Sequence, residues 1–168
     1  MRQTPTTSIP AADLISPEFE AFTRSLVASD GVLDVYLHRP AGPVAISGGP
    51  YGPQTIQAQA MSDDLASFLS SSLAKLNGQQ GLPVRVVDQE QSADVRFYLD
   101  TSIDLGDGSV VLGIALQNPG ASPHWEVMLN NPALQAQPLY QRYAALHELG
   151  HTMGLEHPFD GLSLIHIS

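Results

Sequence analysis

The sequence contains no cysteine among its 168 residues. Disulfide bonds, thiolate nucleophiles and thiolate zinc sites are therefore excluded for this chain, as is a latch in which a cysteine blocks a metal ion. Basic residues are also scarce, because seven Lys and Arg stand against seventeen Asp and Glu, a formal net charge of −10. A chain with this balance lacks the basic patch that binds nucleic acid or an anionic membrane surface.

Long apolar runs are missing as well. None reaches the roughly 18 residues of a membrane-spanning helix, and the polar start MRQTPTTSIPAADLIS has no apolar signal-peptide core. We therefore expect a chain that is cytoplasmic, is exported without a cleaved N-terminal signal, or lacks its true start. The 43% hydrophobic content suffices for one core, and 14 Gly with 13 Pro favour strands, turns and long loops over a helical bundle.

Hydrophobic periodicity predicts an α/β or α+β fold with a twisted sheet and two long helices. The helices are expected at 58–76 and 138–154, with a shorter helical stretch at 17–28. The strands are expected at 32–38, 83–87, 93–99, 110–116 and 125–129. Glycine and proline punctuate residues 39–54, which predicts a long loop there.

The last seven residues, LSLIHIS, match the in-frame translation of a transposon-derived sequencing adapter. We therefore interpret residues 162–168 as a non-native tail that adds nothing to the core; a short natural apolar tail is the alternative. On this interpretation His166 is not a metal ligand, and the natural protein continues beyond Gly161.

Three of the six histidines lie within eleven residues, in the window HELGHTMGLEH from His147 to His157. On a helix, His147 and His151 lie one turn apart on the same face, so their imidazoles can converge on one ion. Gly154 can take the positive φ that ends the helix, and the chain then turns back so that His157 completes a three-nitrogen site. Neutral imidazoles suit zinc, and three protein ligands leave a fourth position open for water.

Glu148 directly follows His147 and can reach a water on the ion without being a ligand. Zinc lowers the pKa of such a water toward ~7 and polarises a substrate carbonyl, while Glu148 would take the proton and pass it to the leaving amine. The sequence therefore predicts a zinc-dependent endopeptidase that works without a covalent intermediate. The alternatives are a zinc-binding module without turnover and three unrelated surface histidines.

The pattern HExxHxxGxxH, followed by Pro158, resembles the extended zinc signature of the metzincin metallopeptidases, above all the serralysin and matrixin-like branches. The resemblance implies a metzincin-like N-terminal subdomain with a mostly parallel five-stranded sheet and one antiparallel edge strand. It also implies a secreted, extracellular protein exported without a cleaved signal peptide. Metzincins carry a methionine turn downstream of the third histidine, and no methionine follows Met153. We therefore expect an N-terminal segment at 1–30 and a truncated catalytic domain at 31–161.

In the family, the edge strand binds the extended peptide substrate through its backbone. The resemblance gives that role to the residues Leu112, Gly113, Ile114, Ala115 and Leu116. We therefore expect residues 111–116 to be antiparallel to one neighbour and to keep one row of backbone groups free for a protein or peptide substrate. Gly113 is expected to leave room for another backbone to approach closely.

Two further groups of residues carry side chains that can bind metal ions. Asp100, Asp104 and Asp107 could hold calcium, although a solvated acidic turn is the alternative. His38 and His124 stand alone in the sequence and are predicted not to be ligands.

Overall fold

The computed structural model describes residues 14–77, 82–103, 110–157 and 164–166. Its helices are α1 (Pro17–Leu26), α2 (Asp63–Leu76), α3 (Asn131–Leu134) and α4 (Pro138–His151), with short 3-10 turns η2 (Gly49–Tyr51) and η3 (Glu90–Ser92). Its strands are β1 (Leu33–Leu37), β2 (Gly42–Ile46), β3 (Gln54–Ala58), β4 (Val84–Val87), β5 (Val95–Asp100), β6 (Val111–Asn118), β7 (His124–Asn130) and β8 (Leu164–His166). No helix in these ranges is both long and apolar enough to cross a membrane.

Helices α1 and α2 begin after a serine that caps them. Ser62 precedes α2, and its hydroxyl accepts the backbone N–H of Leu65 at 3.2 Å, while Asp63 and Asp64 fill the first turn. Ser16 plays the same part before α1, where its hydroxyl accepts the N–H of Phe19 at 3.4 Å. Proline opens α1 and α4 at a first-turn position, where its missing N–H costs nothing.

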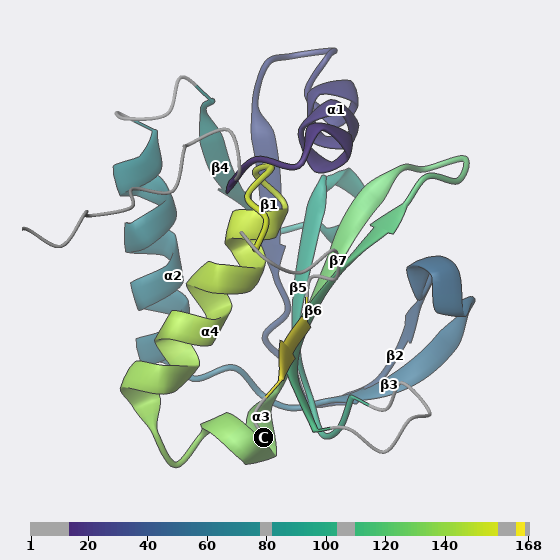
Figure 1. The fold of residues 1–168 in the computed structure, drawn as a ribbon. Helices are drawn as coiled ribbons and strands as arrows, with labels where there is room; N and C mark the ends of the chain where they lie inside the picture. The colour runs from purple at the N-terminus through teal and green to yellow at the C-terminus, as the bar shows by residue number, and fades with distance from the viewer. Residues whose placement is uncertain (1–13, 78–81, 104–109, 158–163, 167–168) are drawn as a thin grey trace, which may run out of the picture.

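The strands form one mixed sheet within the described ranges (Figure 1). Strands β4, β1, β5 and β7 lie side by side and run parallel, and β6 joins β7 in the antiparallel direction. The hairpin of β2 and β3 meets β5 where Ala58 pairs with Asp100. Strand β8 pairs antiparallel with the other side of β6. The expected mixed α/β class is therefore confirmed.

Apolar side chains pack on both faces of the sheet. Helices α2 and α4 lie on one side of it, and the β2–β3 hairpin bends toward the other (Figure 1). The main core lies between the helices and the sheet, with Leu69, Phe97 and Leu149 among its buried side chains. A smaller apolar cluster fills the hairpin side. Its buried members are Ile46, Ile56, Tyr98, Val111, Ile114, Leu116 and Met128.

Helix α1 lies within the helical stretch predicted at 17–28 and packs against one end of the core. Phe19 and Phe22 meet the Trp125 ring edge-on, with ring centroids 5.4 and 5.3 Å away. The Thr23 hydroxyl donates to the Thr152 carbonyl at 2.6 Å and accepts the indole N–H of Trp125 at 2.9 Å. These contacts tie the N-terminal segment to the end of α4.

The sheet is larger than the sequence predicted. Eight strands occur in the described ranges, not five, and the pairings are mixed rather than mostly parallel. The loop predicted at 39–54 is wrong, because residues 42–46 form β2 and pair with β3. Only the centre of that stretch is a turn, where Gly48, Gly49 and Gly52 have positive φ.

Candidate metal centre

Three histidine rings meet at the C-terminal end of α4. His147 and His151 lie on the helix and His157 follows the turn after it, and one nitrogen from each ring lies within 4.8 Å of the others. The Nε2 atom of His147 is 2.6 Å from that of His157 and 3.1 Å from that of His151. Two ligands of a tetrahedral zinc ion stand ~3.3 Å apart when each bond is ~2.0–2.1 Å. The donor set therefore suits zinc and the His147–His151 spacing matches it, while the His147–His157 pair would have to move apart by several tenths of an ångström.

The turn after α4 brings the third histidine back. Gly154 has φ +94°, which only glycine adopts without strain, and its N–H donates to the His151 carbonyl at 3.0 Å. Its carbonyl accepts the N–H of Ser16 at 2.8 Å, so α1 holds the turn from outside. The structure thus gives Gly154 the conformation that the sequence predicted.

A backbone contact orients the buried ring. His151 is 2% exposed, and its Nδ1 lies 2.7 Å from the Leu155 carbonyl, which can only accept. Nδ1 therefore carries the proton, and the Nε2 lone pair faces the other two rings. Such a bond fixes the orientation of a metal-binding imidazole in many proteins.

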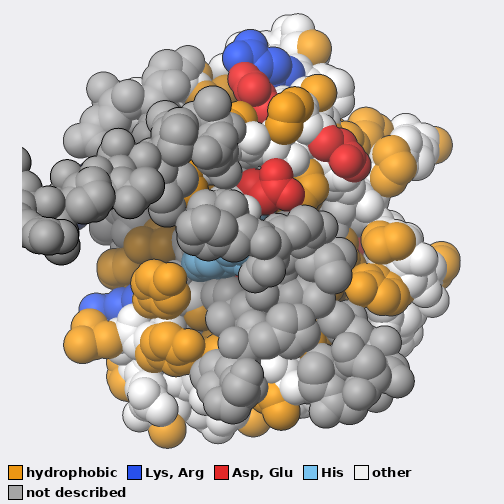
Figure 2. Space-filling model, in the orientation of Figure 1, with side chains coloured by type: hydrophobic (Ala, Val, Ile, Leu, Met, Phe, Trp, Pro, Cys, Tyr) orange, Lys and Arg blue, Asp and Glu red, His pale blue; other side chains and the backbone are white. Residues whose placement is uncertain are grey.

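The environment keeps two of the rings neutral. Burial, with smaller contributions from the neighbouring rings of His151 and His157, lowers the pKa of His147 to about 4. Burial also lowers the pKa of His151. Neutral imidazoles have the free lone pair that a metal ion needs, so His147 and His151 can act as ligands at neutral pH. Histidine surface is visible near the C-terminal end of α4 in Figure 2, beside residues drawn in grey.

Glu148 points into the protein between α4 and the sheet. Its side chain is fully buried, and within the described ranges neither carboxyl oxygen has a hydrogen-bond partner. Burial raises the pKa of Glu148 to about 8. It does not belong to the cluster of possible metal ligands, which contains only the three histidines in the described residues. An unpartnered buried carboxyl beside such a cluster is typical of a reactive group.

The strand predicted to bind substrate lies next to Glu148, but it is not a free edge. Residues Leu112, Gly113, Ile114, Ala115 and Leu116 all belong to β6, which is antiparallel to β7 as expected. Strand β8 pairs with the other side of β6 at Val111 and Ile114, with an irregular register between them. The expected row of free backbone groups is therefore wrong for this stretch, because the chain's own residues 164–166 occupy it.

Three of the remaining candidates, Asp100, His38 and His124, do not belong to the cluster of His147, His151 and His157. Asp100 is buried at the end of β5, whereas Asp104 and Asp107, the other calcium candidates, lie outside the described residues. His38 packs against Tyr36 and Tyr98, and neither it nor His124 joins the cluster of possible ligands. Of the predicted tail, the structure describes only the backbone of 164–166, which forms β8.

Sequence analysis did not predict a second buried glutamate. Glu126, on β7, accepts the backbone N–H of Ser47 at 2.7 Å and of Gly48 at 2.8 Å. The Nε2 atom of His124 lies 3.2 Å from the same carboxylate. A charged residue within the apolar strand 124–130 is the only signal the sequence offers, and the donors come from nearly 80 positions away.

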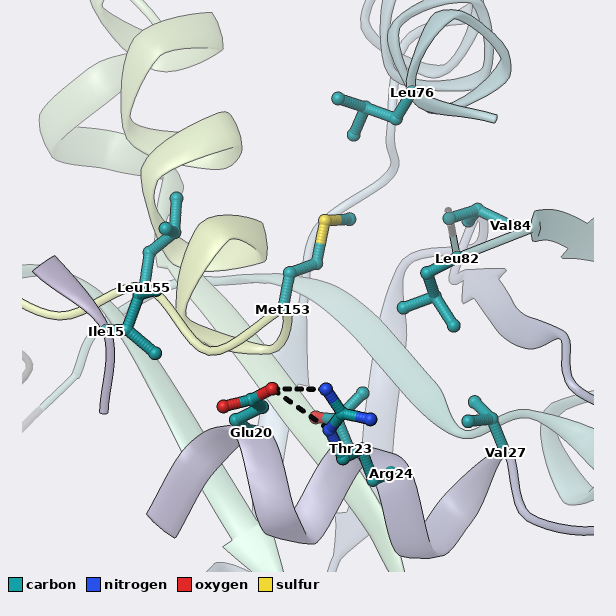
Figure 3. A pocket seen from close by; sticks show the side chains of 10 residues that line it. All are labelled: Ile15, Glu20, Thr23, Arg24, Val27, Leu76, Leu82, Val84, Met153 and Leu155. Atoms are coloured by element: carbon teal, nitrogen blue, oxygen red, sulfur yellow. Dashed lines mark hydrogen bonds and ion pairs between the residues drawn. The ribbon is translucent and has the colours of Figure 1, made fainter. Parts of the chain in front are cut away.

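An apolar cavity of about 360 Å³ lies beside α1, away from the three histidines. Figure 3 shows its lining, in which the Met153 side chain stands between Leu76 and Leu155 and the Glu20–Arg24 ion pair lies at one side. Met153 thus contributes to this cavity and not to the metal centre.

No protein-family model matches the chain, and no curated protein matches it. Among solved structures, a chain in the structure titled "GM1 bound form of the ECX AB5 holotoxin" is similar over 82% of this chain and 56% of that one. The sequence identity is 20% and the TM-score is 0.42. This chain thus spans little more than half the length of its match, and a similarity this weak carries no argument about function.

Proposed function

We propose that this chain is a zinc-dependent endopeptidase, built on a metzincin-like N-terminal subdomain and acting on protein or peptide substrates outside the cell. One observation carries the proposal: three histidine nitrogen atoms converge at the end of α4, and the residue directly after His147 is a glutamate that is buried and has no hydrogen-bond partner in the described ranges. A structural zinc site has no use for an unpartnered carboxyl at that position, because the carboxyl costs folding free energy.

The residues of the site have two separate roles, metal binding and proton transfer. His147, His151 and His157 would hold zinc, which when bound polarises a carbonyl and lowers the pKa of water. Glu148 would take a proton from the attacking water and return it to the leaving amine. The burial that raises the pKa of Glu148 suits this task, because the carboxyl can then hold a proton near neutral pH.

Strand β6 would hold the substrate from Leu112 to Leu116. An extended peptide gains main-chain hydrogen bonds by adding to a strand edge, whatever its own sequence. Strand β8 pairs with β6 in the antiparallel geometry that a bound peptide would adopt. A peptide would then have to displace residues 164–166.

The decisive experiment combines zinc binding with peptide cleavage. Metal-free protein is titrated with Zn²⁺, and hydrolysis of a mixed fluorogenic peptide library is then followed for the wild type and for Glu148→Gln. We expect one zinc per chain in both proteins and a loss of cleavage of about 10²–10⁴-fold in the variant. His151→Ala should lose zinc, whereas His38→Gln, a histidine outside the cluster, should keep both properties.

The alternative is a zinc-binding module without turnover. The occupied outer side of β6 favours it, because the backbone groups that would bind a peptide are already paired. Stoichiometric zinc with no cleavage, both in this chain and after removal of residues 162–168, would establish the module. Cleavage that Glu148→Gln does not reduce would refute the assigned role of Glu148.

A further inference from the structure

Gly113 is the point at which β6 lies closest to the Glu148 side chain. It sits within the strand and pairs with Leu129 of β7, and its φ is not positive. Its backbone would therefore accept any residue. What the position lacks is space, because a Cβ on Gly113 would stand 2.7 Å from both Cγ and Oε1 of Glu148 and 2.9 Å from its Cδ.

These distances are far shorter than an ordinary contact. Non-bonded carbon atoms settle at about 3.5–4.0 Å, so a methyl group at position 113 and the present Glu148 side chain exclude each other. The sequence suggested that another backbone would approach Gly113. The three nearest atoms all belong to the Glu148 side chain instead.

The carboxyl has nothing else to hold it. Within the described part of the chain neither of its oxygens meets a hydrogen-bond donor, and the side chain is fully buried. Its position is therefore set by packing alone. Packing fixes a side chain only where the walls around it leave one place to go, and Gly113 forms one of those walls.

We propose that Gly113 is a positioning residue for Glu148: its missing side chain makes the slot that receives the carboxyl beside the three histidines. The inference rests on the proposed function, because it assigns Gly113 a part in the step that Glu148 performs. A methyl group at 113 would push the carboxyl out of the slot, since the three atoms nearest to it all belong to the Glu148 side chain and not to His147, His151 or His157. Displacement of a reacting group by ~1 Å can lower a rate by ~10²-fold.

A double-mutant cycle tests the slot without any activity measurement. Gly113→Ala is made in the wild type and in Glu148→Ala, which lacks the three atoms that would lie nearest to the methyl. Urea unfolding of the metal-free proteins should show a lower midpoint for Gly113→Ala in the wild type and no such loss in the Glu148→Ala background. Gly120→Ala is the matched control, because a Cβ there meets nothing within 4 Å, and it should be neutral in both.

The outcomes separate this inference from the proposed function. If Gly113→Ala lowers the unfolding midpoint equally in both backgrounds, the proposed slot is refuted, whether or not the wild type cleaves peptides. If Gly113→Ala fails to fold alone, folding of the double variant supports the slot, and failure of both variants overturns it.

The catalytic part of the inference is tested on the zinc-loaded protein. Gly113→Ala should keep one zinc per chain and an unchanged KM, while kcat falls by ~10²-fold. If kcat is unchanged while Gly113→Ala destabilises only the protein that carries Glu148, Gly113 is a packing residue without a catalytic role. A wild type that binds zinc without turnover would refute the endopeptidase and this catalytic role together, and the unfolding cycle alone would then decide the slot.

Discussion

Two glutamates lie in the interior of this protein under opposite conditions. Glu148 on α4 and Glu126 on β7 are 0% and 1% exposed. Glu126 has two backbone N–H donors and the His124 ring around its carboxylate, whereas Glu148 has no hydrogen-bond partner in the described ranges. Burial raises the pKa of Glu148 to about 8. Burial pushes the pKa of Glu126 in the same direction, but hydrogen bonds from His124, Ser47 and Gly48 outweigh it and hold that pKa below its usual value.

The difference separates a structural carboxylate from a reactive one. Glu126 joins the turn between β2 and β3 to the middle of the sheet, and Asn118 assists by accepting the N–H of Gly49 at 2.8 Å. Within the described ranges Glu148 joins no elements by hydrogen bonding, and its burial makes the fold less stable. A protein keeps such a group where its chemistry is needed, so the unpartnered glutamate marks the site.

The largest effect that would test this contrast is the change from Glu to Gln at each position. Glu126→Gln removes the charge that three donors share, and we expect a loss of about 3 kcal/mol in the free energy of unfolding. Glu148→Gln removes an unpartnered buried acid, so it should not lower stability. Urea denaturation of the metal-free proteins at pH 7 measures both. Equal destabilisation at the two positions would contradict the comparison.

A smaller effect is the dependence of stability on pH. Glu148 has a folded-state pKa of about 8 against an ordinary value of 4.5. Below pH 4.5 both states hold the proton and there is no penalty. Between these values the unfolded chain releases the proton while the folded one keeps it, so stability falls as the pH rises. Above pH 8 the penalty is constant.

Comparing each Glu-to-Gln variant with the wild type isolates the pH dependence due to that glutamate, because the histidines titrate in both proteins. We expect the stability of Glu148→Gln, relative to the metal-free wild type, to rise by about 1.4 kcal/mol per pH unit between pH 5 and 7.5. Glu126 has the opposite sign, because its lowered pKa gives a stabilisation that is lost as the pH falls through the folded pKa. Unfolding midpoints at several pH values would show it, and a flat difference for Glu148 would place its carboxyl in water.

The contrast also shows what the sequence could and could not predict. The convergence of His147, His151 and His157 depends on helix geometry and one glycine turn, all within eleven residues, so spacing alone predicted it. Strands β1, β4, β5, β6 and β7 were visible from their alternation. The partners of Glu126 could not be foreseen, because Ser47 and Gly48 reach it only through the tertiary fold.

The strands that were not predicted have a local cause. Residues 42–46 are few and lie within 39–54, where glycine and proline favour a loop. Residues 54–58 begin at the end of that stretch and are equally few. Their pairing with each other and with β5 is what makes them strands. Strand β8 was missed because the tail was set aside, and no local pattern shows that its backbone would reach β6.

The smallest expected effect concerns that tail, and it asks whether the isolation of Glu148 depends on β8. Strand β8 spans Leu164–His166 and pairs with β6 at two positions, so deleting residues 162–168 should change the free energy of unfolding by only about 1 kcal/mol. Glu148 meets β6 at Gly113, a contact that the deletion leaves in place. The pH-dependent difference between the wild type and Glu148→Gln should therefore persist in the shortened chain.

Hydrogen exchange in the same shortened chain locates the change. Amides of β6 that face β8 should exchange faster, because they lose their partners, while those that face β7 should stay protected. Amides of the β2–β3 hairpin, which Glu126 anchors, serve as the internal reference. If the deletion also abolished the pH-dependent difference at Glu148, the tail would be what keeps water from that carboxyl. Gly113 and the tail would then each form one wall around the Glu148 carboxyl.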